Sequence, residues 1–137
     1  MNLTLIFLLA FIIFAIILAI MVFILAGKHK ITERDKRSIR NEWNKIVDMN
    51  NDNPDSALMN ADKLLDHTLN VLGHTGTLGD KLKKAGPLFH DLNGVWEAHK
   101  LRNKIAHEIG FKLTTQESAK YLIKYKSALK DLGVNFK

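Results

Sequence analysis

Cysteine is absent from this chain of 137 residues, which excludes disulfide bonds, zinc sites built on thiolates and thiol nucleophiles. Charged side chains are absent from residues 1–27, so the whole formal net charge of +6 belongs to the rest of the chain. No stretch alternates convincingly between apolar and polar residues with a period of two, so no β-sheet is expected. Neither a glycine-rich phosphate loop nor a Ser-His-Asp arrangement is visible in the sequence.

Metal binding is also not expected. His90, His99 and His107 are nine and eight residues apart, which is not the spacing of short ligand pairs, and no obvious carboxylate completes such a site. The sequence therefore predicts neither a metal nor a cofactor.

The length is enough for one small domain. The basic portion suits an anionic partner such as RNA or a lipid headgroup, with ordinary solubility as the alternative.

The N-terminal segment is a continuous apolar run from Leu3 to Ala26, broken only by Thr4. At about 1.5 Å per residue it forms a helix of roughly 36 Å, which exceeds the hydrocarbon thickness of roughly 30 Å. A secretory signal peptide would have a basic start and a shorter apolar region. We therefore expect residues 1–27 to be a retained transmembrane anchor.

The orientation of this span follows from the charges beside it. Residues 28–32 form a basic juxtamembrane linker, and the domain begins at residue 33. Nothing basic except the amino terminus precedes the span, whereas a basic cluster follows it at Lys28, Lys30, Arg34, Lys36, Arg37 and Arg40. The positive-inside rule then predicts a single-pass protein of the cell membrane, with its N-terminus outside and its C-terminal domain in the cytoplasm. The same cluster is placed to touch anionic lipid.

The cytoplasmic part, residues 33–137, reads as helices separated by turns. Thr32 is the expected cap of a first helix to about residue 49, and Pro54 the first residue of a second helix that ends at Gly73. A short basic helix around residues 81–84 stops at Gly86 and Pro87. Further helices are expected over residues 88–108 and, from a capping box at Thr114, to residue 132. We predict an all-α fold, an up-down bundle of four main helices with one short helix.

The 88–108 helix has two faces on a helical wheel. One is apolar and should meet the core: Val95, Ala98, Leu101, Ile105 and Ile109. The opposite sector would be exposed in a monomer and holds Phe89, Leu92, Trp96, His99, Asn103 and His107. A two-fold homodimer would cover this sector. The alternative is that the short helix or the first helix covers it within one chain.

The same helix ends in a group of side chains able to bind a phosphate and move a proton: Arg102, Asn103 and His107. Arg102 lies about 140° around the helix from His107, so the two do not naturally converge on one phosphate. Pairing of two helices would bring polar residues of each protomer into one cleft. Dimerisation is therefore our expectation for the site as well as for the apolar sector.

These residues carry a family resemblance. The pattern Arg-Asn-x-x-x-His at the end of a late bundle helix resembles the HEPN superfamily of small helical proteins. The longer run from Trp96 to Glu108 is similar to that family's signature helix, and residues 61–66 resemble the preceding helix of many bacterial members. The resemblance covers roughly residues 33 to 133.

The resemblance implies a metal-independent endoribonuclease, a toxin or defence effector, with its site at a dimer interface. It assigns His107 to proton transfer, Arg102 to stabilising charge on the phosphate, and Asn103 to orienting its neighbours or a phosphate oxygen. The RNA 2′-hydroxyl would attack, leaving a 2′,3′-cyclic phosphate and a 5′-hydroxyl. Other members of the family bind without cutting, so the alternative is an inactive, membrane-tethered interaction or assembly module.

Structural roles compete with these assignments. Arg102 can pair with a carboxylate, and His107 can cap the helix C-terminus. His99 is a second site residue or a surface histidine, and Trp96 stacks a base or packs at the interface. The basic residues at 81–84 hold RNA or form a solvated face.

Overall fold

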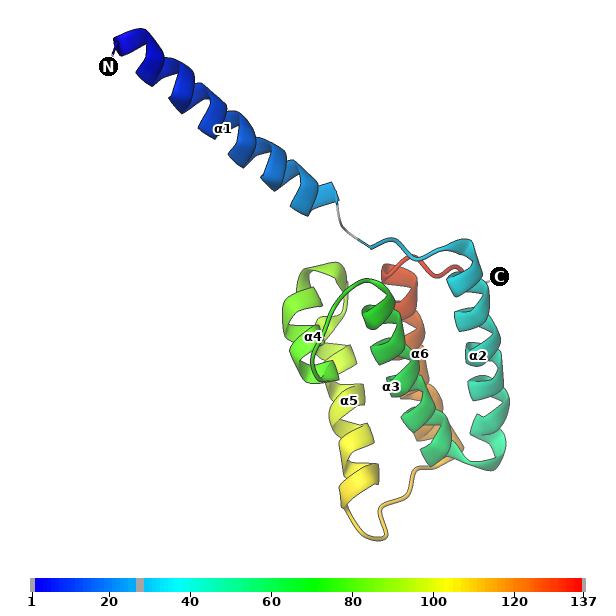
Figure 1. Cartoon of the computed structure of the whole chain (residues 1–137). Coiled ribbons are helices and arrows are strands. Elements are labelled where there is room, and N and C mark those ends of the chain that lie inside the picture. The colour runs from blue at the N-terminus through cyan, green and yellow to red at the C-terminus, as the bar shows by residue number, and fades with distance from the viewer. Residues whose placement is uncertain (1, 27–28, 137) are drawn as a thin grey trace.

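The computed structural model describes residues 2–26 and 29–136, and each regular element within these ranges is a helix (Figure 1). This confirms the all-α class predicted from the sequence. The elements are α1 (Leu3–Ala26), α2 (Glu33–Asp52), α3 (Pro54–Val71), α4 (Leu78–Ala85), the 3₁₀ turn η1 (Gly86–Leu88), α5 (Leu92–His107) and α6 (Thr115–Asp131).

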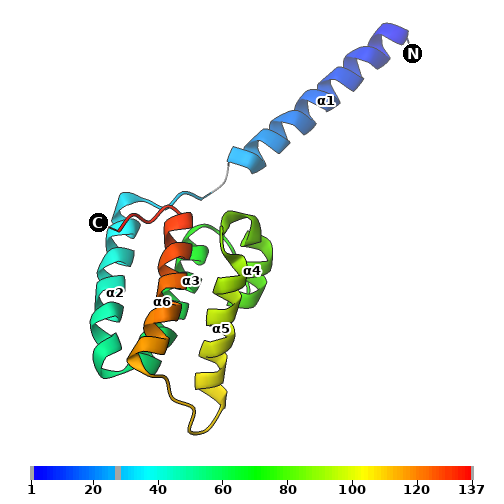
Figure 2. The same cartoon turned by 180° about the vertical axis from the view of Figure 1, so that it is seen from behind.

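Helix α1 stands apart from the helices that follow it (Figures 1 and 2). Its stretch from Leu3 to Ile24 has a mean hydropathy of 3.5 and no buried residues, so it is long and apolar enough to cross a membrane. The large apolar side chains along this stretch are exposed, whereas the apolar side chains of a helix in a folded core are buried. Length and composition both fit the predicted span.

Capping side chains set the beginnings of the main helices. Thr32 caps α2 and Thr114 caps α6, each in a reciprocal capping box with the residue three positions later. Asn53 accepts a hydrogen bond from the backbone of Ser56 and so caps α3, with Pro54 in its first turn. These helix starts confirm the ones predicted from the sequence.

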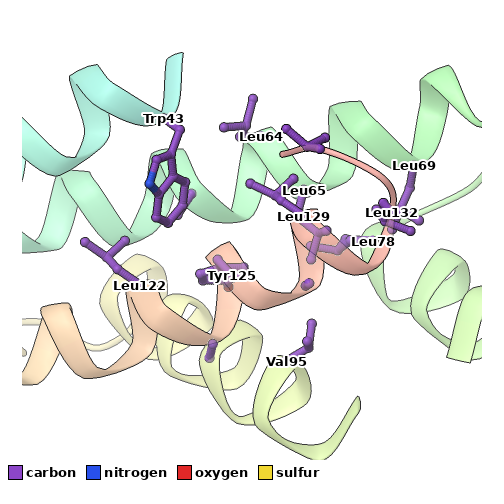
Figure 3. Close-up of a cluster of buried hydrophobic side chains, with 14 of the residues drawn as sticks. Trp43, Leu64, Leu65, Leu69, Leu78, Val95, Leu122, Tyr125, Leu129 and Leu132 are labelled. Carbon is purple, nitrogen blue, oxygen red and sulfur yellow. The ribbon is translucent and has the colours of Figure 1, made fainter. Parts of the chain in front are cut away.

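The core lies between five helices of the bundle, α2 to α6, with α3 packed against both α2 and α6 (Figures 1 and 2). Figure 3 shows side chains from these helices meeting in one cluster. Helix α3 contributes an apolar stripe to this cluster, and Leu72, which follows the helix, is packed against the cluster's edge; the stripe is Ala57, Leu58, Ala61, Leu64, Leu65 and Leu69. The fully buried members with the largest side chains include Ile39, Leu58, Leu65, Leu69, Leu82, Val95, Tyr125 and Leu129.

The chain after α6 returns to the start of α2 (Figures 1 and 2). The ring of Phe136 meets the edge of Trp43, with centroids 5.7 Å apart, and Val134 is fully buried. The backbone carbonyl of Asn135 accepts a hydrogen bond from Arg40 at 3.4 Å. This tail encloses a pocket of about 520 Å³ beside α2 that contains none of the predicted catalytic or interface residues.

Three expectations about the helices are wrong. Helix α5 begins at Leu92 rather than at residue 88, because Pro87 lies in the 3₁₀ turn and Asp91 caps the helix by accepting a hydrogen bond from the backbone of Gly94. Ile109 lies beyond the helix and is fully exposed, so it is not part of the core face. Helix α2 continues to Asp52, which leaves only Asn53 between it and α3.

Candidate functional site

Arg102 lies on the side of α5 that faces α3. Its Nε atom is 3.3 Å from Oδ2 of Asp62, and its Nη1 donates a hydrogen bond of 3.1 Å to Oδ1 of Asn103. The Nε atom is buried but its N–H is not directed at the carboxylate, so the contact with Asp62 is an ion pair without a hydrogen bond at this atom. About a quarter of the Arg102 side chain, 24%, remains exposed, and the residue lines a pocket at the surface.

Asp62 is the centre of a buried polar cluster. It is only 5% exposed, and its Oδ1 accepts a hydrogen bond from the hydroxyl of Tyr125 at 2.8 Å. The same oxygen lies 2.7 Å from Nδ1 of His99. A buried carboxylate is costly unless charged and hydrogen-bonding partners surround it. Asp62 belongs to α3, His99 to α5 and Tyr125 to α6, so three helices supply this cluster.

Tyr125 acts in this cluster as a hydrogen-bond donor. Burial raises the pKa of its hydroxyl well above the ordinary value of 10.0, and the negative charge of Asp62 and their hydrogen bond raise it further. The hydroxyl therefore keeps its proton at every working pH and points it at the carboxylate. This geometry secures Asp62 from the side of the core.

His99 is held by the same carboxylate. Because a carboxylate only accepts, the network assigns a hydrogen to Nδ1 of His99, which leaves Nε2 as an acceptor in the neutral ring. The edge of Trp96 meets this ring, with centroids 6.0 Å apart. His99 is thus neither a simple surface histidine nor an isolated one.

His99 and Arg102 both line a pocket of about 250 Å³ between α3, α5 and the loop that leads into α4. The other polar residues of its wall include Asp62, Lys63, Asp66 and Thr77. Asp66 is paired with Lys81 at 2.7 Å, so its charge is neutralised. The pocket is therefore balanced between acids and bases rather than strongly acidic.

His107 lies apart from this cluster. It is the last residue of α5 and is exposed, and within residues 29–136 no hydrogen bond or ion pair involves its ring. The structure brings Arg102 and Asn103 together, but within residues 29–136 neither of them forms a side-chain hydrogen bond or an ion pair with His107. The divergence expected from the helical wheel is consistent with this arrangement.

The apolar sector of α5 is more covered than predicted. Phe89 is only 8% exposed and belongs to the core, so its expected exposure on a monomer is wrong. Leu92 and Trp96 are half-buried and pack against the core. The indole ring of Trp96 lies over Gly79 of α4, where an added Cβ would be 3.6 Å from it. The short helix therefore covers part of this face within one chain.

The basic residues differ in their surroundings. Lys81 is 2% exposed and paired with Asp66, so it is not on a solvated face. Lys28 lies outside the described residues. Lys30, Arg34 and Arg37 are exposed, whereas Lys36 is partly buried and pairs with Glu33 at 2.8 Å.

The described part of the chain contains no group of three or more His, Asp or Glu side chains that could hold a metal ion. The residue of the buried polar cluster that the sequence interpretation missed is Asp62. Its signal was available, since Asp62 lies at helical spacing with the buried Leu58, Leu65 and Leu69. A carboxylate within a core stripe requires buried partners, and these are His99, Arg102 and Tyr125.

Comparisons with protein-family models, curated proteins and solved structures returned no match to this chain.

Proposed function

We propose that this protein is a membrane-anchored, metal-independent endoribonuclease with a HEPN-like, up-down helical bundle. One observation carries the proposal: Arg102 is fixed beside Asn103 with part of its side chain exposed. The exposed His107, whose ring has no hydrogen-bond partner among residues 29–136, ends the same helix. A fixed guanidinium binds a phosphate, and an exposed imidazole can move a proton. Cleavage of RNA by its own 2′-hydroxyl uses both of these groups.

The site is completed in a homodimer. Arg102 is held on the α3 side of its helix by Asp62, about 140° around from His107. Two α5 helices packed about a two-fold axis place Arg102 of one protomer near His107 of its partner. Leu92 and Trp96, which are half-buried in one chain, contribute the apolar part of this contact.

The anchor sets the location of the activity. Helix α1 spans the cell membrane once, and the basic residues that follow it keep the bundle in the cytoplasm. Exposed Lys30, Arg34 and Arg37 lie where anionic headgroups are found. The substrate is then cytoplasmic RNA, and the role is that of a toxin or defence effector held at the membrane.

A second function is favoured by a different observation. Hydrogen-bonding side chains surround the Arg102–Asp62 ion pair, and a buried ion pair with a purely structural role requires such neighbours. In that case the bundle is a catalytically inactive, membrane-tethered assembly module. The two proposals differ in whether Arg102 is available to a phosphate.

Cleavage of a labelled RNA by the full chain in detergent micelles tests the proposal. We expect a 2′,3′-cyclic phosphate product from the wild type and loss of cleavage in His107→Ala. No cleavage by the wild type, or equal cleavage by both proteins, would leave only the assembly module. His90→Ala is the matched control, because His90 is also exposed but pairs with Asp131 away from Arg102.

Mixing inactive variants tests the shared site. When Arg102→Ala and His107→Ala chains exchange freely, about half of the dimers are heterodimers. Each heterodimer has two shared sites, and one of them keeps both Arg102 and His107. The mixture should therefore regain roughly a quarter of the wild-type rate. If the mixture stays as inactive as each variant alone, a site shared in this way is excluded.

A further inference from the structure

The geometry points to His99 as a second proton-transfer residue of this site, the base that takes the proton from the RNA 2′-hydroxyl, with Asp62 as its positioning residue. This inference rests on the proposed ribonuclease function and assigns His107 to the other proton. Cleavage needs two proton transfers, one from the attacking hydroxyl and one to the leaving oxygen. The motif at the end of α5 supplies only one histidine for them.

The contacts of His99 prepare it for this role. Its Nδ1 lies 2.7 Å from Asp62, and the carboxylate, itself 5% exposed, cannot turn away because Tyr125 holds it from the core side. The neutral ring then presents a bare Nε2, the acceptor that a base must offer. A carboxylate that orients a histidine in this way also stabilises the imidazolium that forms.

The surroundings of His99 are suited to a phosphodiester. His99 and Arg102 contact the same carboxylate and line the same pocket of about 250 Å³. Lys63 also lines it, and the charge of Asp66 is neutralised by Lys81. A second histidine–aspartate pair, His90 with Asp131 at 2.6 Å, lacks these features, because the His90 side chain is 89% exposed and no arginine within residues 29–136 pairs with Asp131. The chain thus contains its own control.

The reaction balances with the two histidines. Nε2 of His99 takes the proton of the 2′-hydroxyl while O2′ forms a bond to phosphorus. The bond between phosphorus and O5′ breaks, and O5′ receives a proton from His107 of the partner protomer. Arg102 faces the negative charge that gathers on the phosphate oxygens. No oxidant, metal or further reactant is required.

The first test uses His99→Asn in the full chain in detergent micelles. Asparagine keeps an amide nitrogen near the position of Nδ1, so the hydrogen bond to Asp62 is retained while the base is lost. We expect cleavage to slow by about 10²–10⁴-fold, with no change for the matched His90→Asn. Cleavage by His99→Asn at the wild-type rate, with its helical circular dichroism intact, would overturn the assignment.

The second test separates the base from the acid. In a substrate whose bridging O5′ is replaced by sulfur, the leaving thiolate needs no proton, because thiols have a pKa near 8.5. His107→Ala should regain most of its cleavage on this substrate, whereas His99→Asn should not. Rescue of His99→Asn, or of neither variant, would contradict the division of labour.

A third measurement does not depend on cleavage. Imidazole ¹⁵N resonances of the full chain report which ring nitrogen of His99 carries the hydrogen, and we expect Nδ1. A 2′-deoxy-substituted oligonucleotide, which cannot be cut, should shift the resonance of His99 and leave that of His90 in place. In Asp62→Asn the two neutral forms of the His99 ring should mix, and a ring that keeps its hydrogen on Nδ1 in this variant would show that Asp62 does not position it.

The outcomes distinguish the two proposals. If the wild type cuts RNA but His99→Asn is unaffected, the inference fails and the proposed function stands. If the wild type is inert, the proposed function and the proton-transfer role of His99 both fail, and the ¹⁵N shift decides separately whether the pocket binds a phosphodiester.

Discussion

Replacing Asp62 with asparagine should destabilise the bundle strongly, because it removes the charge around which three helices place polar groups. Breaking a buried ion pair by neutralising one partner lowers the free energy of unfolding by about 3–5 kcal/mol. Arg102 keeps 24% of its side chain in solvent and its Nε–H is not directed at the carboxylate, so water compensates part of the loss. We therefore expect the lower end, about 3 kcal/mol.

Chemical denaturation of the full chain in detergent micelles measures this loss. Both tryptophans, Trp43 and Trp96, lie in the bundle and none lies in α1, so their fluorescence reports on the bundle alone. Glu42→Gln is the control, because Glu42 forms an ion pair with Lys45 in which both side chains are more than half exposed, and it should change stability by less than about 0.5 kcal/mol.

The result that would refute the reasoning is a loss of less than about 1 kcal/mol for Asp62→Asn, the value of an ordinary hydrogen bond. The double variant Asp62→Asn, Arg102→Met sharpens the test. If the cost comes from an unpaired guanidinium, removing the guanidinium as well should recover part of it, so the two changes should be less than additive. Additive losses would mean that the pair contributes nothing as a pair.

Three other changes should have effects that depend on close contacts in the bundle. Gly94→Ala should lower the midpoint of thermal unfolding although alanine favours helices, because the added Cβ would clash with Oδ2 of Asp91. Gly79→Ala, whose added Cβ would have its nearest neighbour at 3.6 Å, should be neutral or stabilising. Asp66→Ala should lower the free energy of unfolding, measured in denaturant, by more than Lys81→Met does. Asp66→Ala leaves the ammonium of Lys81, which is 2% exposed, without its partner, whereas Lys81→Met leaves the carboxylate of Asp66, which is 36% exposed, in contact with water. Equal losses would contradict this asymmetry. Hydrogen bonds from the capping threonines hold the pKa of three carboxyls, Asp35, Asp80 and Glu117, below their ordinary values of 3.8 for aspartate and 4.5 for glutamate. The unfolded chain therefore binds more protons in acid, so the stability that these carboxyls contribute is complete above about pH 4.5 and is lost as the pH falls through the lowered pKa values. Acid titration followed by circular dichroism should show this loss, and replacing the three capping threonines with alanine should make the loss smaller.

The parts of the fold that the sequence predicts are those determined by local chemistry. Thr32 and Thr114 each stand three residues before an acid, and the resulting capping boxes begin α2 and α6 as expected. The apolar stripe of α3 is buried because its spacing leaves it one face on which to pack. Periodicity and caps act within a few residues, so they can be recognised without knowledge of the fold.

The start of α5 could not be predicted in this way. The apolar pattern from residue 88 onward suits a helix, yet Phe89 turns into the core and the backbone and ring of His90 bind Asp131 at the end of α6. These are contacts across 41 residues of sequence, and they favour an extended backbone over another helical turn. Tertiary contacts of this kind override a local pattern.

Local chemistry and tertiary contacts also differ in what they reveal about the motif of Arg102 and His107. Its residues and spacing are visible in the sequence, but the direction of Arg102 is set by Asp62, 40 positions earlier in the chain. That carboxylate holds Arg102 toward α3 and places it beside His99 rather than His107. The histidine that shares a carboxylate with the arginine is therefore not the one that the motif names. Under the proposed function, a phosphate bound at Arg102 lies at the pocket that His99 also lines, and His107 is supplied by a second chain.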